Sequence, residues 1–354
     1  MFVKVFLPVS DKHSHSPVNT SPMKKKEDTR KIKIILAPLQ GFTDVTYRNV
    51  FSTHFKGVDE AVAPFISTMG QKRLKPSRIK DVLPQKNRNL PVVPQILGNV
   101  PEDFIFLADH LYEMGHKRIN WNLGCPHSKI AKKQRGSGLL CYPDKIDAFL
   151  NAVMPRLSNR LSVKIRLGRK DKAEIGSNLP VFDTYPLEEI ILHPRTGVQM
   201  YTGHADLEAF QSAIESSSHR FTYNGDIVDL NSFYRAQKRS HGTHRFMIGR
   251  GILSNPFLAE DIKGIDNPAD RIKRIRAFHD DLFDGYQKIF SGPSHLTGRM
   301  KGFWTYLGPS FKDSKAPLKK ILKSRTLDAY TDRVEAFFNT VQAFTGPSSG
   351  LFQD

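Results

Sequence analysis

The segment Asn122-Leu-Gly-Cys125-Pro-His places a thiol in a turn that directly follows an apolar run. A lone cysteine is more often an inert core residue, but a glycine before it and a proline after it do not suit a core strand. At its ordinary pKa of about 8.5, a thiol stays mostly protonated at neutral pH. We therefore predict that Cys125 is a proton donor to a bound ligand, with an inert buried thiol as the alternative.

Lys164 lies within the apolar run SVKIRLG (162–168). Burial of an unpaired ammonium group is costly, so a lysine that points into the protein needs an anionic partner. A bound cofactor that carries negative charge would supply this partner, and His193 in the next run could hydrogen-bond the same region. The alternative is an ion pair between Lys164 and a structural carboxylate.

Two glycine-containing turns follow one another in the segments Tyr223-Asn-Gly-Asp226 and Ile248-Gly-Arg-Gly-Ile252. Glycine lets backbone N–H groups approach an anion closely, and barrels commonly bind phosphate in the loops after their last two strands. Arg250 could add a charge-assisted contact. We predict a phosphate site here, and tight turns without a ligand are the alternative.

The elements that must position these residues are eight short apolar runs separated by segments with helical character. The runs are IKIILAP (32–38), VDEAVAPF (58–65), PVVPQILG (91–98), KRINWNLG (117–124), LSVKIRLG (161–168), LEEIILHPR (187–195), RFTYNGDI (220–227) and RFMIGRGI (245–252). This alternation predicts a parallel α/β fold, and eight runs favour a closed TIM (β/α)8 barrel over a doubly wound sheet. A barrel holds its active site where its strands end, and polar residues stand there in nearly every run. They are Gln95, Asn122, Cys125, Lys164, His193, Arg195, Asn224, Asp226 and Arg250.

After about residue 267 the pattern changes to helices without strands, over 271–290, 298–308, 316–324 and 327–344. These predict a small C-terminal all-α helical bundle. We expect a disordered extension (1–31), a barrel domain (32–266), a helical domain (267–345) and a flexible tail (346–354). In the basic stretch 312–325, which includes Lys319 and Lys320, the only acidic residue is Asp313. This stretch is predicted to contact phosphates, and a solvated helix face is the alternative.

The chain is strongly basic, with 53 Lys and Arg against 35 Asp and Glu among 354 residues, a net charge of +18 and a pI near 9.8. Such a balance is typical of proteins that bind nucleic acid or anionic lipid. No apolar stretch reaches the roughly 18 residues that a membrane span requires, so we expect no membrane partner. The two cysteines, Cys125 and Cys141, allow no disulfide framework and have no zinc-ligand spacing. These features predict a cytoplasmic protein without a metal.

In these motifs and their order the chain resembles the tRNA-dihydrouridine synthases over roughly residues 34–258. The helical C-terminal part is also similar to the RNA-binding bundle of that family in size and placement. The matching segments are Leu-Ala-Pro38-Leu-Gln-Gly-Phe-Thr-Asp44, Val-Pro-Gln95-Ile-Leu-Gly, Asn122-Leu-Gly-Cys125-Pro, Gly136-Ser-Gly-Leu-Leu, Val-Lys164-Ile-Arg-Leu-Gly, His193-Pro-Arg195-Thr-Gly-Val-Gln-Met-Tyr-Thr-Gly, Asn224-Gly-Asp and Gly249-Arg-Gly.

The resemblance implies a barrel that binds FMN. The FMN-binding residues that it implies are Pro38, Leu39 and Gln40 through their backbone, Gln95, Lys164 and His193 at the flavin ring, and Asn224, Gly225, Asp226, Gly249 and Arg250 at the ribityl phosphate. Cys125 would be the general acid, Asn122 would contact the uracil, and Arg195 would contact the flavin or the RNA.

The activity that the resemblance implies is reduction of the uridine C5=C6 bond in folded tRNA. NADPH would reduce FMN, the flavin would deliver hydride to C6, and Cys125 would protonate C5. The RNA backbone must be held while the target base leaves its stack, a task predicted for residues that include Lys319 and Lys320. We expect a monomer.

Two other functions stay open. An FMN-dependent barrel oxidoreductase for a small molecule would keep the phosphate turns but does not need the basic bundle. A non-catalytic RNA-binding protein would use Cys125 and Lys164 only as structural residues. A metal-dependent lyase barrel fits less well, because the sequence lacks the acidic clusters that it needs at strand ends.

Overall fold

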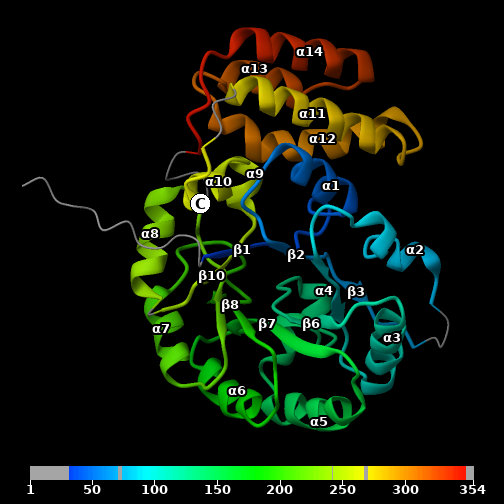
Figure 1. The fold of residues 1–354 in the computed structure, drawn as a ribbon, viewed down its shortest axis with the longest axis vertical. Coiled ribbons are helices and arrows are strands. Elements are labelled where there is room, and N and C mark those ends of the chain that lie inside the picture. Colours follow the sequence, from blue (N-terminus) through cyan, green and yellow to red (C-terminus); the bar gives the residue numbers. More distant parts are fainter. Residues whose placement is uncertain (1–31, 71–73, 241, 267–269, 348–354) are drawn as a thin grey trace, which may run out of the picture.

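The described part of the chain is a parallel barrel with a helical bundle packed against it (Figure 1). The computed structural model describes residues 32–70, 74–240, 242–266 and 270–347. The predictions for residues 1–31 and for most of the 346–354 tail lie outside the described residues. The strands are β1 (Lys33–Leu36), β2 (Glu60–Val62), β3 (Ile66–Ser67), β4 (Val92–Val93), β5 (Gln95–Leu97), β6 (Arg118–Leu123), β7 (Arg160–Gly168), β8 (Ile190–Thr196), β9 (Phe221–Tyr223) and β10 (Arg245–Ile248).

The sheet is a closed barrel, and its strand order has two ends only because two of its strands are interrupted. Its order is β3-β5-β6-β7-β8-β9-β10-β1-β2-β4. β2 and β3 are two parts of one strand, and β4 and β5 are two parts of the next, separated by Pro94, which has no backbone N–H to donate. Ala61 of β2 pairs with Val92 of β4, and Ile66 of β3 pairs with Ile96 of β5. The two ends of the sheet order therefore belong to neighbouring strands, and the predicted eight-stranded TIM barrel is confirmed.

Helices cover the outside of the barrel and bury their apolar faces against the strands. On β6, Trp121 faces outward and stacks on Phe149 of α5, with 4.1 Å between the ring centroids. Its neighbours Asn120 and Asn122 face the interior, where both bond to the side chain of Gln95. This two-residue alternation is what a barrel strand requires. The helices around the barrel are α1 (Val45–His54), α2 (Pro76–Ile79), α3 (Pro101–Glu113), α4 (Ser128–Ala131), α5 (Pro143–Val153), α6 (Glu174–Asp183), α7 (Leu207–Glu215), α8 (Leu230–Arg239), α9 (Arg250–Ser254) and α10 (Leu258–Lys263).

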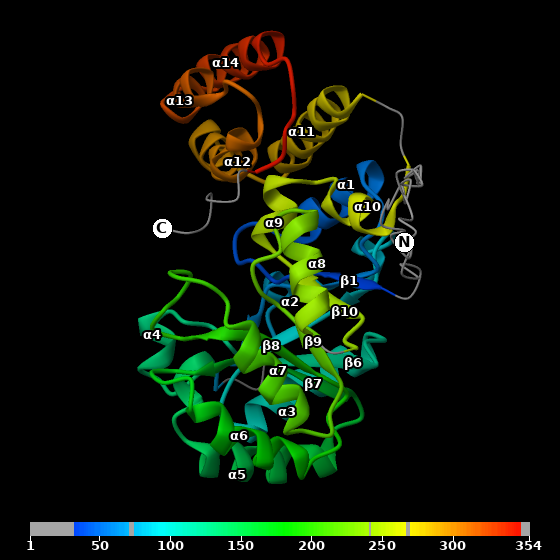
Figure 2. The ribbon, with the colours of Figure 1, turned by 90° about the vertical axis from the view of Figure 1, so that its left-hand side faces the viewer.

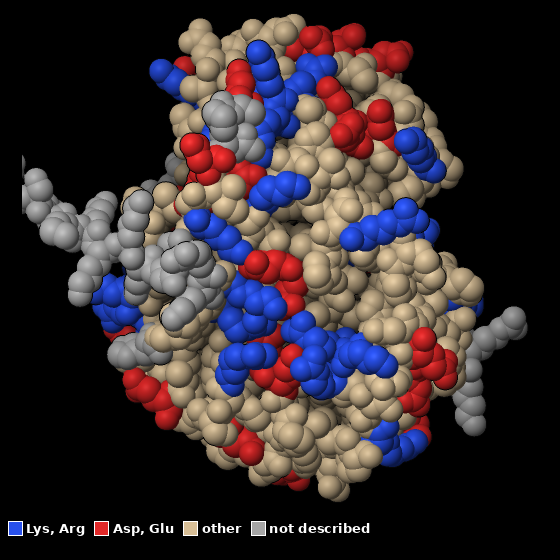
Figure 3. Space-filling model, viewed as in Figure 1, with Lys and Arg blue, Asp and Glu red and all other residues tan. Residues whose placement is uncertain are grey.

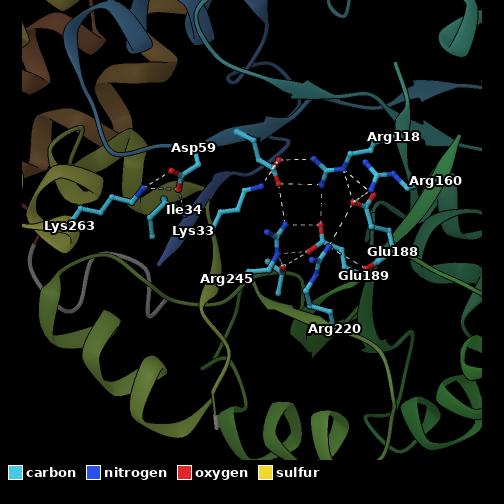
Figure 4. Close-up of polar contacts among 12 residues, drawn as sticks. Lys33, Ile34, Asp59, Arg118, Arg160, Glu188, Glu189, Arg220, Arg245 and Lys263 are labelled. Carbon is cyan, nitrogen blue, oxygen red and sulfur yellow. Dashed lines mark hydrogen bonds and ion pairs between the residues drawn. The ribbon is translucent and has the colours of Figure 1, made fainter. Parts of the chain in front are cut away.

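Partly buried ion pairs join the amino ends of the strands (Figure 4). The carboxylate of Glu60, at the start of β2, lies 2.8 Å from Arg118, 2.9 Å from Lys33 and 3.1 Å from Arg245. Arg245 also donates to Glu189 over 2.8 Å. Burial alone would raise the pKa of Glu60, but its hydrogen bonds and charge interactions with Arg118 and Lys33 hold this pKa at about 2. Seen from this end of the barrel, basic and acidic side chains gather around its middle (Figure 3). The face opposite a barrel's active site commonly serves stability, as these pairs do.

The C-terminal helices form the predicted bundle, which packs on the barrel through α1 (Figure 2). Tyr47 of α1 stacks on Phe303 of α12 with 5.4 Å between the ring centroids, and Phe278 of α11 packs edge-on against Phe55 at 5.1 Å. Aromatic contacts of this kind stabilise an interface beyond the area they bury. No helix in the described ranges has the length and apolarity needed to cross a membrane. The bundle helices are α11 (Arg271–Gln287), α12 (Pro293–Leu307), α13 (Lys315–Leu322) and α14 (Leu327–Thr340).

Candidate active site

A cavity of about 330 Å³ opens at the carboxyl end of the barrel. Its walls come from the ends of β1, β6, β7, β8, β9 and β10 and from Tyr306 of α12. Of the predicted site residues, those that line it are Pro38, Leu39, Gln40, Asn122, Cys125, Lys164, His193, Asn224, Gly225, Asp226, Gly249 and Arg250. Those that do not line it are Gln95, Arg195, Lys319 and Lys320.

The thiol of Cys125 lies in a turn that Asn122 and Gly136 shape. The side-chain oxygen of Asn122 accepts hydrogen bonds from the backbone N–H of Cys125 at 2.9 Å and of Gly124 at 3.1 Å. A Cβ atom on Gly136, which has a φ of 56°, would lie 2.8 Å from the Cys125 carbonyl oxygen, so the approach requires glycine. Burial raises the pKa of Cys125, against a smaller lowering by the backbone of His127. The thiol therefore keeps its proton at neutral pH.

A chain of buried amides fixes Asn122 and separates Gln95 from the cavity. The Asn122 amide nitrogen donates to the Gln95 side chain over 2.7 Å, and the Gln95 nitrogen donates to Asn120 over the same distance. Gln95 is 0% exposed and both ends of its amide are engaged. In this arrangement Gln95 positions Asn122, and its contact with a flavin ring stays a prediction.

Lys164 and Arg166 place two basic side chains on one face of β7, at the wall of the cavity. Burial lowers the pKa of Lys164 to about 7, and the charge of Arg166 lowers it further in the same direction. Within the described residues no carboxylate forms an ion pair with Lys164 or contributes to its pKa. The structural carboxylate that would serve as its partner is therefore not found in this part of the chain. A cavity with such a lysine favours an anionic ligand.

Arg195 lies behind the cavity wall and contacts two residues that line the cavity. Its guanidinium forms a bidentate ion pair with the Asp226 carboxylate, at 2.8 and 2.7 Å. One of the two guanidinium nitrogens in this pair also lies 3.2 Å from Nε2 of His193. The Arg195 side chain is 0% exposed. Its contact with the flavin or the RNA stays a prediction.

The two glycine turns meet beside Arg250. A Cβ atom on Gly225 would lie 2.0 Å from the Tyr223 hydroxyl, which explains the glycine. Arg250 lies 3.3 Å from the Asp226 carboxylate and 4.4 Å from the centroid of the Tyr201 ring. Because Asp226 already binds two arginines, a phosphate here would meet the backbone of the turns and Arg250 rather than the Asp226 carboxylate.

The loop after β1, which carries Pro38, Leu39 and Gln40, is held from the side by the bundle. Leu39 donates its backbone N–H to the Thr43 hydroxyl over 2.8 Å, so this group is not free for a ligand. Phe42 packs edge-on against Phe303 and Tyr306 of α12, at 5.4 and 5.2 Å between the ring centroids. Arg299 of the same helix donates to the Gly41 carbonyl and lies 3.6 Å from the Asp44 carboxylate. The bundle thus helps to shape the cavity wall.

Several residues that line the cavity were not predicted from the sequence. Arg166 stands two residues after Lys164 in a strand, so the two-residue period places it on the same face, and this signal was present. Tyr201 lies within the matching segment 193–203 but was not singled out there. Tyr306 gave no signal, because the packing of α12 brings it to the cavity. Lys319 and Lys320 are exposed on α13, away from the cavity. No group of His, Cys, Asp and Glu side chains in the described ranges is arranged to hold a metal ion.

The fold and the site together describe a TIM-barrel protein with a cavity lined by basic side chains and a protonated thiol at the carboxyl end of its strands. Comparisons with known proteins show the family to which it belongs. The family model described as "Dihydrouridine synthase (Dus)" matches residues 35–294. The chain is 28% identical over 264 residues to a protein of Rhodobacter capsulatus named "Probable tRNA-dihydrouridine synthase", covering 73% of this chain and 80% of the relative. A protein of the same name from Staphylococcus epidermidis is 30% identical over 267 residues, covering 72% of this chain and 78% of the relative. The chain therefore belongs to the dihydrouridine synthase family.

A solved structure, the old yellow enzyme from Trypanosoma cruzi, is similar with a TM-score of 0.48 and 10% sequence identity. The match covers 73% of this chain and 94% of that one.

Proposed function

We propose that this protein is an FMN-dependent tRNA-dihydrouridine synthase, an oxidoreductase that uses NADPH to reduce the C5=C6 bond of uridine in tRNA. The observation that carries the proposal is one cavity that combines a protonated thiol, Cys125, with Lys164, a lysine that has no carboxylate partner among the residues that the structure describes. Membership of the family supports the same reaction.

The residues of the cavity fit FMN. Gly225 and Gly249 bring backbone close to the space where a phosphate would bind, and Arg250 adds a positive charge. Lys164 and Arg166 would stabilise electron-rich atoms of the ring system, and His193 would hydrogen-bond the same region. When bound, FMN supplies the hydride chemistry, and the protein supplies binding, orientation and charge.

Cys125 would give its proton to C5 of the uracil. The hydrogen bonds that the Asn122 side-chain oxygen accepts hold the cysteine turn, so the thiol has a fixed position, and burial keeps it protonated until it is used. The amide nitrogen of Asn122 has a second proton that could bind a uracil carbonyl oxygen.

The bundle would bind the tRNA while the target uridine leaves its stack. Lys319 and Lys320 are exposed and lie in the last turn of α13. The first turn of this helix has no acidic residue. Phosphate contacts from such residues bind RNA without reading its sequence. We propose a monomeric, cytoplasmic protein with a barrel domain over residues 32–266 and a tRNA-binding domain over residues 267–345.

The test is a map of dihydrouridine in the RNA of a strain that lacks this gene. We expect dihydrouridine to be lost at one or more tRNA positions and restored by the wild-type gene but not by Cys125→Ala. The purified protein should also bind FMN. Unchanged dihydrouridine at every position would overturn the proposal, and restoration by Cys125→Ala would overturn the role of the thiol.

A further inference from the structure

The hydrogen bonds around Arg195 determine which ring nitrogen of His193 carries a proton. A guanidinium group has five N–H donors and no acceptor. Nε of Arg195 donates to the Thr202 carbonyl, one Nη donates to Asp226 and to the Gly203 carbonyl, and the other Nη donates to Asp226. Four of the five donors are accounted for in this way.

The fifth donor lies 3.2 Å from Nε2 of His193. Because arginine only donates, the ring nitrogen must accept, and an accepting Nε2 carries no proton. Arg195 itself is 1% exposed and fixed by two backbone carbonyls, so it cannot turn its donor away without leaving that donor buried and unpaired.

The rest of the surroundings keep the ring neutral. Burial lowers the pKa of His193 well below its ordinary value, and the charges of Arg166, Lys164, Arg195 and Arg250 lower it further. Asp226 is the acidic group nearby, and its carboxylate is bound by Arg195 and Arg250 instead of by the imidazole.

We propose that Arg195 is a positioning residue that holds His193 as the neutral tautomer with its proton on Nδ1. His193 lines the cavity, and Nδ1 has no hydrogen-bond partner within the described residues. The ring then offers the ligand an N–H donor and never an acceptor, so it selects a ligand atom with a lone pair, such as a carbonyl oxygen or an unprotonated ring nitrogen. Only the identity of that ligand rests on the proposed function, because the tautomer follows from the protein alone.

The tautomer can be measured in the full-length protein without activity. Two-bond ¹H–¹⁵N NMR spectra of the ¹⁵N-histidine-labelled apoprotein distinguish protonated from unprotonated ring nitrogens, and the His193→Gln variant assigns the signals. We expect His193 to have a protonated Nδ1 and an unprotonated Nε2, unchanged between about pH 5 and pH 8, where an ordinary histidine titrates. A protonated Nε2, or titration of the ring in this range, would overturn the proposal.

Two arginine variants separate the hydrogen bond from the general positive charge. Arg195→Lys keeps the charge but cannot make all five bonds, so we expect His193 to show a mixture of tautomers. Arg166→Lys is the matched control, because Arg166 is similarly buried and donates to the Gly124 and Thr196 carbonyls rather than to His193. The control should keep the Nδ1-protonated form, and an unchanged tautomer in a folded Arg195→Lys variant would contradict the role of Arg195.

Added FMN provides the last comparison. We expect it to shift the Nδ1–H signal while the tautomer stays the same. If FMN fails to bind, the proposed function is wrong although the tautomer assignment stands. If FMN binds and moves the proton to Nε2, the positioning role of Arg195 is wrong although the proposed function stands.

Discussion

Lys164 should behave as a neutral amine at a pH where an ordinary lysine is charged. Its pKa is lowered to about 7 by burial and by Arg166, whereas an ordinary lysine has a pKa of about 10.4. At pH 7 about half of the Lys164 side chains are then neutral, compared with about 1 in 2,500 for an ordinary lysine, a difference of about 10³-fold. Only the neutral amine is a nucleophile, so its rate of acylation reports this fraction.

The assay is trace labelling of the apoprotein with acetic anhydride at a series of pH values, followed by peptide mass spectrometry. The midpoint of the pH profile for Lys164 should lie near pH 7. Limited access to the cavity lowers the labelling rate at every pH equally, so the midpoint is the criterion. Arg166→Gln should move the midpoint upward because it removes a positive charge, and Arg166→Lys should move it much less.

The sign of the linked change in stability follows from the same pKa. The unfolded chain binds the Lys164 proton more tightly than the folded chain, so this group makes the apoprotein more stable as the pH rises from about 7 to about 10. A Lys164 midpoint near the ordinary lysine value, in apoprotein that circular dichroism shows to be folded, would refute the reasoning. Equal midpoints in Arg166→Gln and Arg166→Lys would refute the contribution of Arg166.

Three other predictions concern the acid, the base of the barrel and the RNA contact. Cys125→Ala should slow single-turnover formation of dihydrouridine by about 10²-fold or more and leave FMN binding intact, and a near-normal rate would contradict its role as general acid. Glu60→Gln should lower the free energy of unfolding in urea by about 1–3 kcal/mol at neutral pH, because it removes the buried carboxylate that Lys33, Arg118 and Arg245 share, while Arg118 and Arg245 keep Glu188 and Glu189 as partners. The pKa of Glu60 is about 2 in the folded chain and 4.5 ordinarily, so the difference in unfolding free energy between wild type and Glu60→Gln should shrink as the pH falls from 4.5 towards 2. A difference in unfolding free energy that stays constant over this range would be inconsistent with the ion pairs. If Lys319 and Lys320 both contact phosphate, replacing them by Gln should reduce the slope of log tRNA affinity against log salt concentration by about 1–2. Lys117→Gln, at the amino end of the barrel, should leave this slope unchanged.

The sequence was sufficient to predict the barrel and much of its cavity, because both depend on local periodicity. Eight apolar runs with helices between them specify the strands, and residues at the ends of parallel strands must meet at one end of the barrel. The turn at Cys125 was predictable for the same reason, since glycine and proline restrict the backbone on either side of it. Arg166 could have been added from its two-residue spacing to Lys164.

The remaining contacts depend on which side chains reach one another across the barrel. Gln95 was predicted at a strand end, but it is the first residue of β5, and its amide makes hydrogen bonds with Asn120 and Asn122, 25 and 27 residues away in the chain. Arg195 binds Asp226, 31 residues away, and so lies behind the cavity wall. Periodicity indicates the end of the barrel at which a residue lies, but it does not indicate whether a neighbour has already taken its hydrogen bonds.

The contacts of α11 and α12 with the segment that follows β1 restrict how this protein can diverge. Tyr286 donates to Asp44 over 2.9 Å, and Arg299 contacts the same carboxylate. If the bundle binds RNA as proposed, substitutions that adapt it to a different RNA must leave these residues and Phe303 in place, because they also support the cavity wall. New specificity can therefore arise on the outer faces of α13 and α14, and a barrel cut at residue 266 would be a poor scaffold for engineering, because its cavity loop would lose its support.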